Sequence, residues 1–308
     1  MNPRNIPLVA GSLLLLAAAA AVPKHKVYVV GDSTSCVYAS NLAPRTGWGQ
    51  VLQALFQADS VEVVDKALSG RSSKSFYTEK NWDPIKSALR QGDYVIIAFG
   101  HNDEKTDDAT RGTLPGSTFE QYLSIYIDDA KDKGAIPLLV TPIERNGWSS
   151  ATTVKASHGL YPQAIRDLAK KKGIGLVDLT VLTTALYQKL GKDATTNTVF
   201  LNLPAGVYAN YPNGVTDNTH LQLRGANEIA KLLAADIAKQ KLPAISSWLV
   251  GSVVGVDRNG LGLRRSAHGG HGGVDALGRS RDRRFAGEGA SGRLAPQYGT
   301  PVERKDSP

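Results

Sequence analysis

The sequence predicts a three-layer α/β/α sandwich with a five-stranded parallel sheet in residues 24–249. Two observations support this fold class. From Lys26 onward, short apolar runs rich in β-branched residues alternate with amphipathic segments of helical period, which is typical of βαβ units. The chain also has 308 residues and 42% hydrophobic content, which is enough to build one large core of this kind.

Five apolar runs are predicted to form the strands, and six segments with helical spacing are predicted to form the helices. The strands are expected at residues 27–30, 61–64, 93–99, 136–140 and 176–179. The helices are expected at residues 48–57, 83–90 and 118–133, within 151–172, at 183–190, and from about 220 to 239. Pro84 suits a first helical turn, and Lys172 followed by Gly173 suits a helix carboxyl terminus.

The amino terminus is predicted to be a secretory signal peptide in residues 1–21. Arg4 precedes a nearly unbroken apolar run from residue 6 to residue 22, and the small residues Ala18-Ala19-Ala20-Ala21 suit a signal peptidase. We therefore expect a secreted or periplasmic protein with no stable membrane association after cleavage. The alternative is an uncleaved anchor, because the run is nearly long enough to span a bilayer.

The carboxyl-terminal segment, residues 250–308, is predicted to be a disordered tail. It holds 13 of the 31 glycines, two Arg-Arg pairs and few large apolar residues. Such a segment cannot bury enough apolar surface to offset its ordering entropy. A short carbohydrate-binding appendage and an artefact of the reading frame are the alternatives that the sequence leaves open.

The charge and cysteine content exclude some classes of protein. Half of the formal net charge of +8 lies in residues 250–308, so the remainder has no clustered basic stripe of the kind that binds nucleic acid. Cys36 is the only cysteine, so no intramolecular disulfide can form. Because Cys36 lies near a predicted turn and helix start, we interpret it as a buried structural thiol rather than a nucleophile.

Four polar segments carry the candidate chemistry. Gly31-Asp32-Ser33 directly follows the first strand, and ligands bind at the carboxyl ends of strands in open α/β sheets. The other three are Ser69-Gly70-Arg71-Ser72, Gly100-His101-Asn102-Asp103 and Asp217-Asn218-Thr219-His220. Acyl transfer needs a nucleophile, a base, a group that orients the base, and donors for an oxyanion, and these segments contain such residue types.

These four segments, in this order, resemble the sequence blocks of the GDSL or SGNH hydrolases over residues 26–237. The resemblance implies a flavodoxin-like sheet of strand order 2-1-3-4-5. It also implies that Ser33 is the nucleophile, that His220 is the base, and that Asp217 orients His220. The oxyanion donors would be the backbone N–H groups of Ser33 and Gly70 and the side-chain amide of Asn102.

Residues 67–76, 99–103 and 141–146 look most like the rhamnogalacturonan acetylesterase branch of that family. In this interpretation Arg71 and Arg145 contact galacturonate carboxylates, and Trp48 and Trp148 stack on sugar rings. The alternatives are solvated loop charges for the arginines and packed loop aromatics for the tryptophans.

The resemblance implies a serine esterase that removes acetyl groups from an acetylated plant cell-wall polysaccharide through an acyl-Ser33 intermediate. We expect a monomer with no metal or organic cofactor, since no zinc pattern, phosphate loop or dinucleotide fingerprint occurs. The alternatives within the enzyme class are a GDSL lipase or thioesterase and a xylan acetylesterase. The alternative outside it is a carbohydrate-binding module that has lost catalysis.

Overall fold

The computed structural model describes residues 24–254, and the predicted signal peptide lies outside them. Five parallel strands form one sheet in the order β2-β1-β3-β4-β5, which confirms the predicted fold class and strand order. The strands are β1 (His25–Gly31), β2 (Val61–Asp65), β3 (Tyr94–Ala98), β4 (Ile136–Val140) and β5 (Gly175–Val177). Within the described residues, no helix is both long and apolar enough to cross a membrane.

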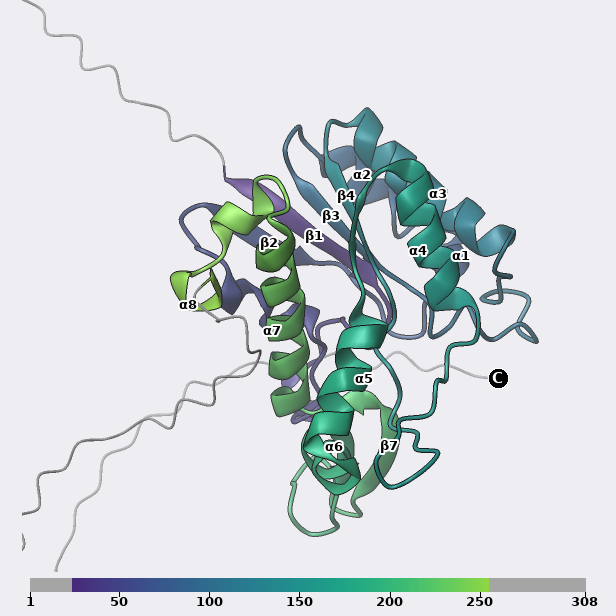
Figure 1. The fold of residues 1–308 in the computed structure, drawn as a ribbon, viewed down its shortest axis with the longest axis vertical. Coiled ribbons are helices and arrows are strands. Elements are labelled where there is room, and N and C mark those ends of the chain that lie inside the picture. Colours follow the sequence, from purple (N-terminus) through teal and green to yellow (C-terminus); the bar gives the residue numbers. More distant parts are fainter. Residues whose placement is uncertain (1–23, 255–308) are drawn as a thin grey trace, which may run out of the picture. The chain divides into compact units, whose positions relative to one another are not determined.

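Helices cover both faces of this sheet (Figure 1). On one face lie α1 (Ser73–Thr78), α2 (Asp83–Ala88), α3 (Thr118–Asp132) and α4 (Tyr161–Lys172). The other face is covered by the 3₁₀ helix η2 (Gly49–Leu55), α5 (Leu179–Leu190), α7 (Leu223–Gln240) and the 3₁₀ helix η3 (Ile245–Trp248).

Alternate residues of the central strands supply the two cores, because successive side chains of a strand point to opposite faces. Val27 and Val29 of β1 face the α7 side, whereas Tyr28 and Val30 face the α3 side. All four are buried, which explains the continuous apolar run that predicted this strand. The glycine expected after the fourth helix ends α4, since Gly173 adopts a left-handed conformation with φ of 61°.

A two-stranded antiparallel sheet was not predicted. It consists of β6 (Phe200–Leu203) and β7 (Val215–Leu221), and it follows the short helix α6 (Lys192–Thr198). The prediction that the last helix begins near residue 220 is therefore wrong, because His220 belongs to β7 and α7 begins at Leu223. Asp and Asn disfavour strands, so only the pairing with β6 accounts for this extended segment.

Two further expectations need correction. The segment predicted as an α-helix at residues 48–57 is the 3₁₀ helix η2. The boundary at residue 249 is too early, because α8 (Gly251–Val254) packs on the domain: Val253 is only 8% exposed, and the Val250 N–H donates to the Leu55 carbonyl. The remaining residues of the predicted tail, 255–308, lie outside the described residues.

Candidate active site

Ser33 lies in a tight turn at the carboxyl end of β1. The carbonyl of Asp32 accepts hydrogen bonds from the N–H groups of Ser35 and Cys36, which closes the turn. A Cβ at Gly31 would come within 2.6 Å of the Ala98 carbonyl oxygen on β3, so a glycine is required here. The Ser33 carbonyl also accepts a 2.6 Å hydrogen bond from the Tyr38 hydroxyl. This turn therefore holds the serine just after β1, as the sequence predicts.

The hairpin strand β7 brings Asp217 and His220 to the same place. Asp217 Oδ1 accepts 2.9 Å hydrogen bonds from the backbone N–H groups of Thr219 and His220. Its other oxygen, Oδ2, lies 2.7 Å from His220 Nδ1. Because these donors fix both carboxylate oxygens, the orientation of the imidazole is set by its own strand.

His220 Nε2 lies 2.8 Å from Ser33 Oγ, which completes a chain of hydrogen bonds from Asp217 to Ser33. Burial alone would raise the pKa of Asp217, but the bonds from the His220 ring and backbone outweigh it and hold that pKa well below its usual value. The ionised carboxylate accepts a hydrogen bond from the Nδ1–H group, so Nε2 carries no proton and is free to accept the proton of Ser33. This is the arrangement in which histidine acts as a general base.

Two backbone N–H groups and one side-chain amide follow the neighbouring strands β1, β2 and β3 at the carboxyl end of the sheet. Within the described part of the chain, the N–H groups of Ser33 and Gly70 donate no hydrogen bond. Gly70 has φ of 79°, and the space beside its Cα is open, so a ligand can approach this backbone closely. Asn102 Nδ2 donates one hydrogen to the Arg71 carbonyl at 3.0 Å and keeps a second hydrogen free. These are the donors that the sequence predicts for an oxyanion.

Sequence reasoning missed a buried polar network behind these donors. Asp32 Oδ2 lies 3.4 Å from His101 Nδ1, and the His101 ring meets the ring of His158 edge to face with centroids 4.7 Å apart. His158 in turn bonds to Glu104, which pairs with Arg145 at 2.9 Å. Asp32 directly precedes Ser33, and His101 directly precedes Asn102. These neighbouring positions were the only signal in the sequence that pointed to the network.

The predicted sugar-binding residues differ in how far their side chains are exposed. Arg71 has a 42% exposed side chain that pairs with Glu79 at 2.8 Å. Trp148 is partly buried, and its indole N–H donates to Asn146. The prediction that Trp48 stacks on a sugar ring is wrong, because Trp48 is 1% exposed in the core beneath η2. Arg145 Nη1 bonds to Glu104 and Ser157, so its charge is compensated inside the protein and the structure does not support a carboxylate-binding role for it.

Cys36 behaves as a buried structural thiol. Burial raises the pKa of Cys36 to about 11, so the nucleophilic thiolate is scarcely populated near neutral pH. Its sulfur lies 3.9 Å from the Ser33 carbonyl oxygen rather than beside the Ser33 hydroxyl. No group of three or more His, Cys, Asp or Glu side chains within residues 24–254 is arranged to hold a metal ion.

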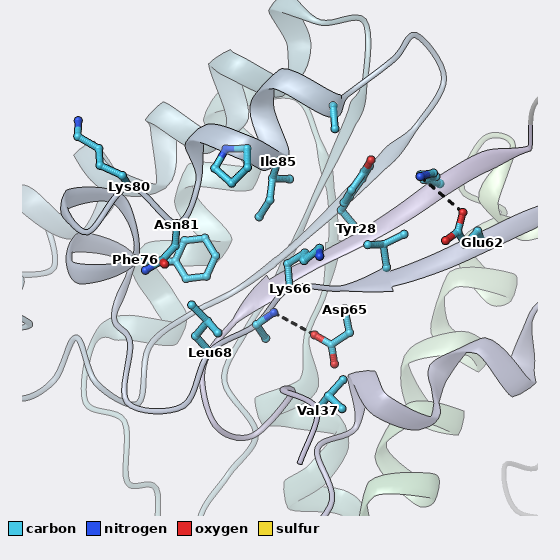
Figure 2. Close-up of a pocket in the computed structure, with 15 residues that line it drawn as sticks. Tyr28, Val37, Glu62, Asp65, Lys66, Leu68, Phe76, Lys80, Asn81 and Ile85 are labelled. Carbon is cyan, nitrogen blue, oxygen red and sulfur yellow. Dashed lines mark hydrogen bonds and ion pairs between the residues drawn. The ribbon is translucent and has the colours of Figure 1, made fainter. Parts of the chain in front are cut away.

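A groove of about 780 Å³ lies along the edge strand β2 (Figure 2). Its lining includes Tyr28 of β1, Ile85 of α2 and Leu68 of the loop after β2. Neither Ser33 nor His220 lines it. The size of this groove is therefore no guide to where the chemistry occurs.

Comparison with known proteins identifies the family. Residues 29–226 match the GDSL-like lipase/acylhydrolase family. The chain belongs to this family. It is therefore an ester-hydrolysing enzyme, and the four polar segments recognised in the sequence lie within the matched region.

Three curated relatives are matched over most of their own length. The chain is 38% identical to rhamnogalacturonan acetylesterase RhgT of Bacillus subtilis over 218 residues, which cover 71% of this chain and 91% of that protein. It is 32% identical to the probable rhamnogalacturonan acetylesterase YesY of the same organism, covering 72% of this chain and 97% of the relative. A rhamnogalacturonan acetylesterase of Emericella nidulans is 29% identical and is matched over 71% of this chain and 86% of its own length.

Solved structures share the fold of this family member. The YxiM protein of Bacillus subtilis superposes with a TM-score of 0.61 at 25% identity over 72% of this chain and 58% of that one. A variant of Axe2, an acetyl-xylooligosaccharide esterase from Geobacillus, superposes with a TM-score of 0.50 at 19% identity over 69% of this chain and 94% of its own. At this level of identity the second likeness concerns the fold alone.

Proposed function

We propose that this protein is a secreted serine esterase that removes acetyl groups from a pectic polysaccharide, rhamnogalacturonan, through an acyl-Ser33 intermediate. The observation that carries the proposal is the continuous path of hydrogen bonds from Asp217 through His220 to Ser33. The curated relatives named rhamnogalacturonan acetylesterase support the choice of substrate.

The acylation step follows from this geometry. Ser33 Oγ attacks the carbonyl carbon of the acetyl group while its proton passes to His220 Nε2, 2.8 Å away. Negative charge develops on the acetyl carbonyl oxygen, where the N–H groups of Ser33 and Gly70 and the free hydrogen of Asn102 stabilise it. His220 then protonates the departing sugar oxygen, which leaves an acetyl ester on Ser33.

Deacylation repeats these roles with water. His220 takes a proton from a water molecule, whose oxygen attacks the acetyl carbon. His220 then gives this proton to Ser33 Oγ as the Ser33–acetyl bond breaks, which releases acetate and restores the free serine. Asp217 stays ionised throughout, because the bonds to its two oxygens hold its pKa well below its usual value. It therefore stabilises the imidazolium that forms in each half-reaction.

The experiment that tests the proposal compares purified wild type with Ser33→Ala on a panel of esters. We expect wild type to release acetate from acetylated rhamnogalacturonan faster than from acetylated xylan, and to hydrolyse p-nitrophenyl acetate faster than longer acyl esters. Ser33→Ala should retain the wild-type circular dichroism spectrum and lose all of these activities. Hydrolysis by Ser33→Ala at the wild-type rate rejects the proposed nucleophile, whereas a preference for long acyl chains indicates a lipase or thioesterase.

Secretion is part of the same proposal, since an acetylated cell-wall polymer lies outside the cell. The Leu- and Ala-rich run in residues 6–22 supports it. Amino-terminal sequencing of the protein recovered from an exporting host tests this proposal. A mature chain that begins shortly after residue 21 is expected, and an intact Met1 would indicate an uncleaved anchor or retention.

A further inference from the structure

We propose that His101 is a positioning residue that couples the two sides of the oxyanion site by holding Asp32, the residue before Ser33, against the loop that carries Asn102. This inference rests on the proposed acyl transfer. The two residues stand directly before the two donors in the chain, and they face each other across the carboxyl ends of neighbouring strands β1 and β3.

The carboxylate of Asp32 is buried, and one of its oxygens depends on His101. The side chain is 1% exposed. Oδ1 accepts hydrogen bonds from the backbone N–H and the hydroxyl of Thr34, at 2.9 and 2.8 Å. Oδ2 accepts no hydrogen bond within the described residues, and the polar group that faces it is His101 Nδ1 at 3.4 Å. A buried carboxylate oxygen is costly without a compensating donor, so this contact restrains both loops.

The His101 ring is equally dependent on this contact. Its side chain is 4% exposed, and neither ring nitrogen makes a hydrogen bond within residues 24–254, although Nδ1 approaches Asp32 Oδ2 at 3.4 Å. Burial lowers the pKa of His101 and outweighs the opposing effect of the facing Asp32 carboxylate. In a neutral ring with its proton on Nδ1, that proton is on the nitrogen that approaches Asp32 Oδ2.

Hydrogen bonds and an ion pair fix the side chains that lie next to the His101 ring. His158 Nε2 bonds to the Ile143 carbonyl at 2.7 Å, and its Nδ1 bonds to Glu104. Arg145 pairs with the same Glu104 carboxylate and lies 3.5 Å from the His101 carbonyl oxygen. Because His158 packs edge to face on His101, it keeps the His101 ring from turning away from Asp32.

This arrangement has a consequence for the chemistry. Burial by itself raises the pKa of Asp32, but the facing His101 and the two bonds from Thr34 outweigh burial and lower it, so the carboxylate is ionised. An ionised carboxylate beside the Ser33 N–H opposes the negative charge that develops on the substrate oxygen. The Nδ1–H of His101 offsets part of that field and keeps the Ser33 and Asn102 donors at a fixed separation.

The test compares two substitutions at the same position. His101→Phe keeps a ring that can pack on His158 but removes the donor, whereas His101→Asn places an amide near the position of Nδ1. We expect His101→Phe to lower kcat for p-nitrophenyl acetate by about 10–100-fold with little change in KM, because small displacements of catalytic groups cost this much. We expect His101→Asn to recover most of the loss. If His101→Phe fails to fold, His101→Leu takes its place.

A double-mutant cycle separates positioning from general destabilisation. If His101 acts through the oxyanion donors, the loss caused by His101→Phe should shrink to less than threefold in an Asn102→Ala background. Ile165→Ala, a substitution in the buried core on α4, is the control for lost stability and should lower Tm without lowering kcat. Equal losses in His101→Phe and His101→Asn, full additivity in the cycle, or unchanged kcat in His101→Phe would each overturn the proposal.

These outcomes are distinct from those that bear on the function itself. Ser33→Ala decides whether Ser33 is the nucleophile, whatever happens at His101. If Ser33→Ala is inactive and His101→Phe is as active as wild type, the positioning role is rejected and the esterase mechanism stands.

Discussion

His220 Nε2 and Ser33 Oγ lie 2.8 Å apart, although 187 residues separate them in the chain. Ser33 lies just after β1 of the parallel sheet, and His220 comes from the separate β6–β7 hairpin. The contact therefore depends on how the hairpin docks beside the sheet. The Asn146 side chain bonds to Asn218 at 2.8 Å and so ties β7 to the loop after β4.

The first prediction concerns Asp217→Asn. An amide can donate to His220 Nδ1, which places the imidazole proton on Nε2 and prevents it from accepting the Ser33 proton. We expect kcat for p-nitrophenyl acetate to fall by about 10⁴-fold with KM nearly unchanged. The matched control is Asp193→Asn, an exposed site on α6, which should be fully active. A loss smaller than tenfold in Asp217→Asn would show that the carboxylate is dispensable.

The second prediction concerns Asn102→Ala. Removing an oxyanion donor costs mainly in the transition state, so we expect kcat to fall by about 10²–10³-fold while KM stays close to wild type. Steady-state kinetics on p-nitrophenyl acetate measures both constants. A raised KM with a normal kcat would instead indicate that Asn102 binds the ground-state substrate.

The third prediction separates the two arginines. The exposed Arg71 lies next to Gly70, so Arg71→Ala should raise KM for acetylated pectic substrate and leave hydrolysis of p-nitrophenyl acetate unchanged. Salt should weaken pectic turnover in wild type more than in Arg71→Ala, because exposed charge pairs are screened. Arg145 is the contrasting site. Since it pairs with Glu104 within the buried network, Arg145→Ala should lower Tm and reduce turnover of both substrates alike.

The fourth prediction concerns pH and the buried carboxyl of Asp65. Burial raises its pKa from 3.8 to about 7, and Oδ2 has no hydrogen-bond partner within the described residues. Between about pH 4 and pH 7, the Asp65 carboxyl therefore keeps a proton in the folded state that it has already released in the unfolded state. The stability from this group is complete below about pH 4 and is lost as pH rises through about 7.

Asp65→Asn removes this titration and keeps an oxygen for the Ala67 N–H, which now bonds to Oδ1. We expect the variant to raise Tm at pH 8 by several degrees and to change it little at pH 4, since 1 kcal/mol corresponds to about 2–4 °C in a domain of this size. Thermal unfolding at both pH values measures the difference. An equal shift at the two values would show that Asp65 is ionised throughout.

The fifth prediction concerns where the folded domain ends. Leu249 is 1% exposed and pairs with Phe56, so truncation after Trp248 should lower Tm. Loss of this buried side chain alone costs about 1.5–3 kcal/mol. Truncation after Val254 removes only residues whose composition is poor in core-forming side chains, and it should leave Tm and kcat unchanged. A fall in Tm on truncation after Val254 would show that residues beyond 254 contribute to the core.

Local patterns were sufficient to predict the parallel sheet and the position of Ser33. The five apolar runs became β1 to β5, because β-branched residues pack well on a sheet. The strands β1, β3 and β4 are almost wholly buried, whereas the edge strands β2 and β5 are mostly half-buried. The turn at Gly31 and the left-handed Gly70 follow from backbone sterics that any chain obeys. Information of this kind lies within a few residues of each position.

Long-range contacts determined the rest of the site. Asp217 and His220 occupy a polar strand that forms only when β6 pairs with it, which is why a helix start was expected there. The residue type of Trp48 does not reveal whether the ring contacts a sugar or the core. Only the packing of η2 against the sheet buries it. Asp32 and His101 form a pair because β1 and β3 are neighbours in space, a relationship that single-residue propensities do not encode.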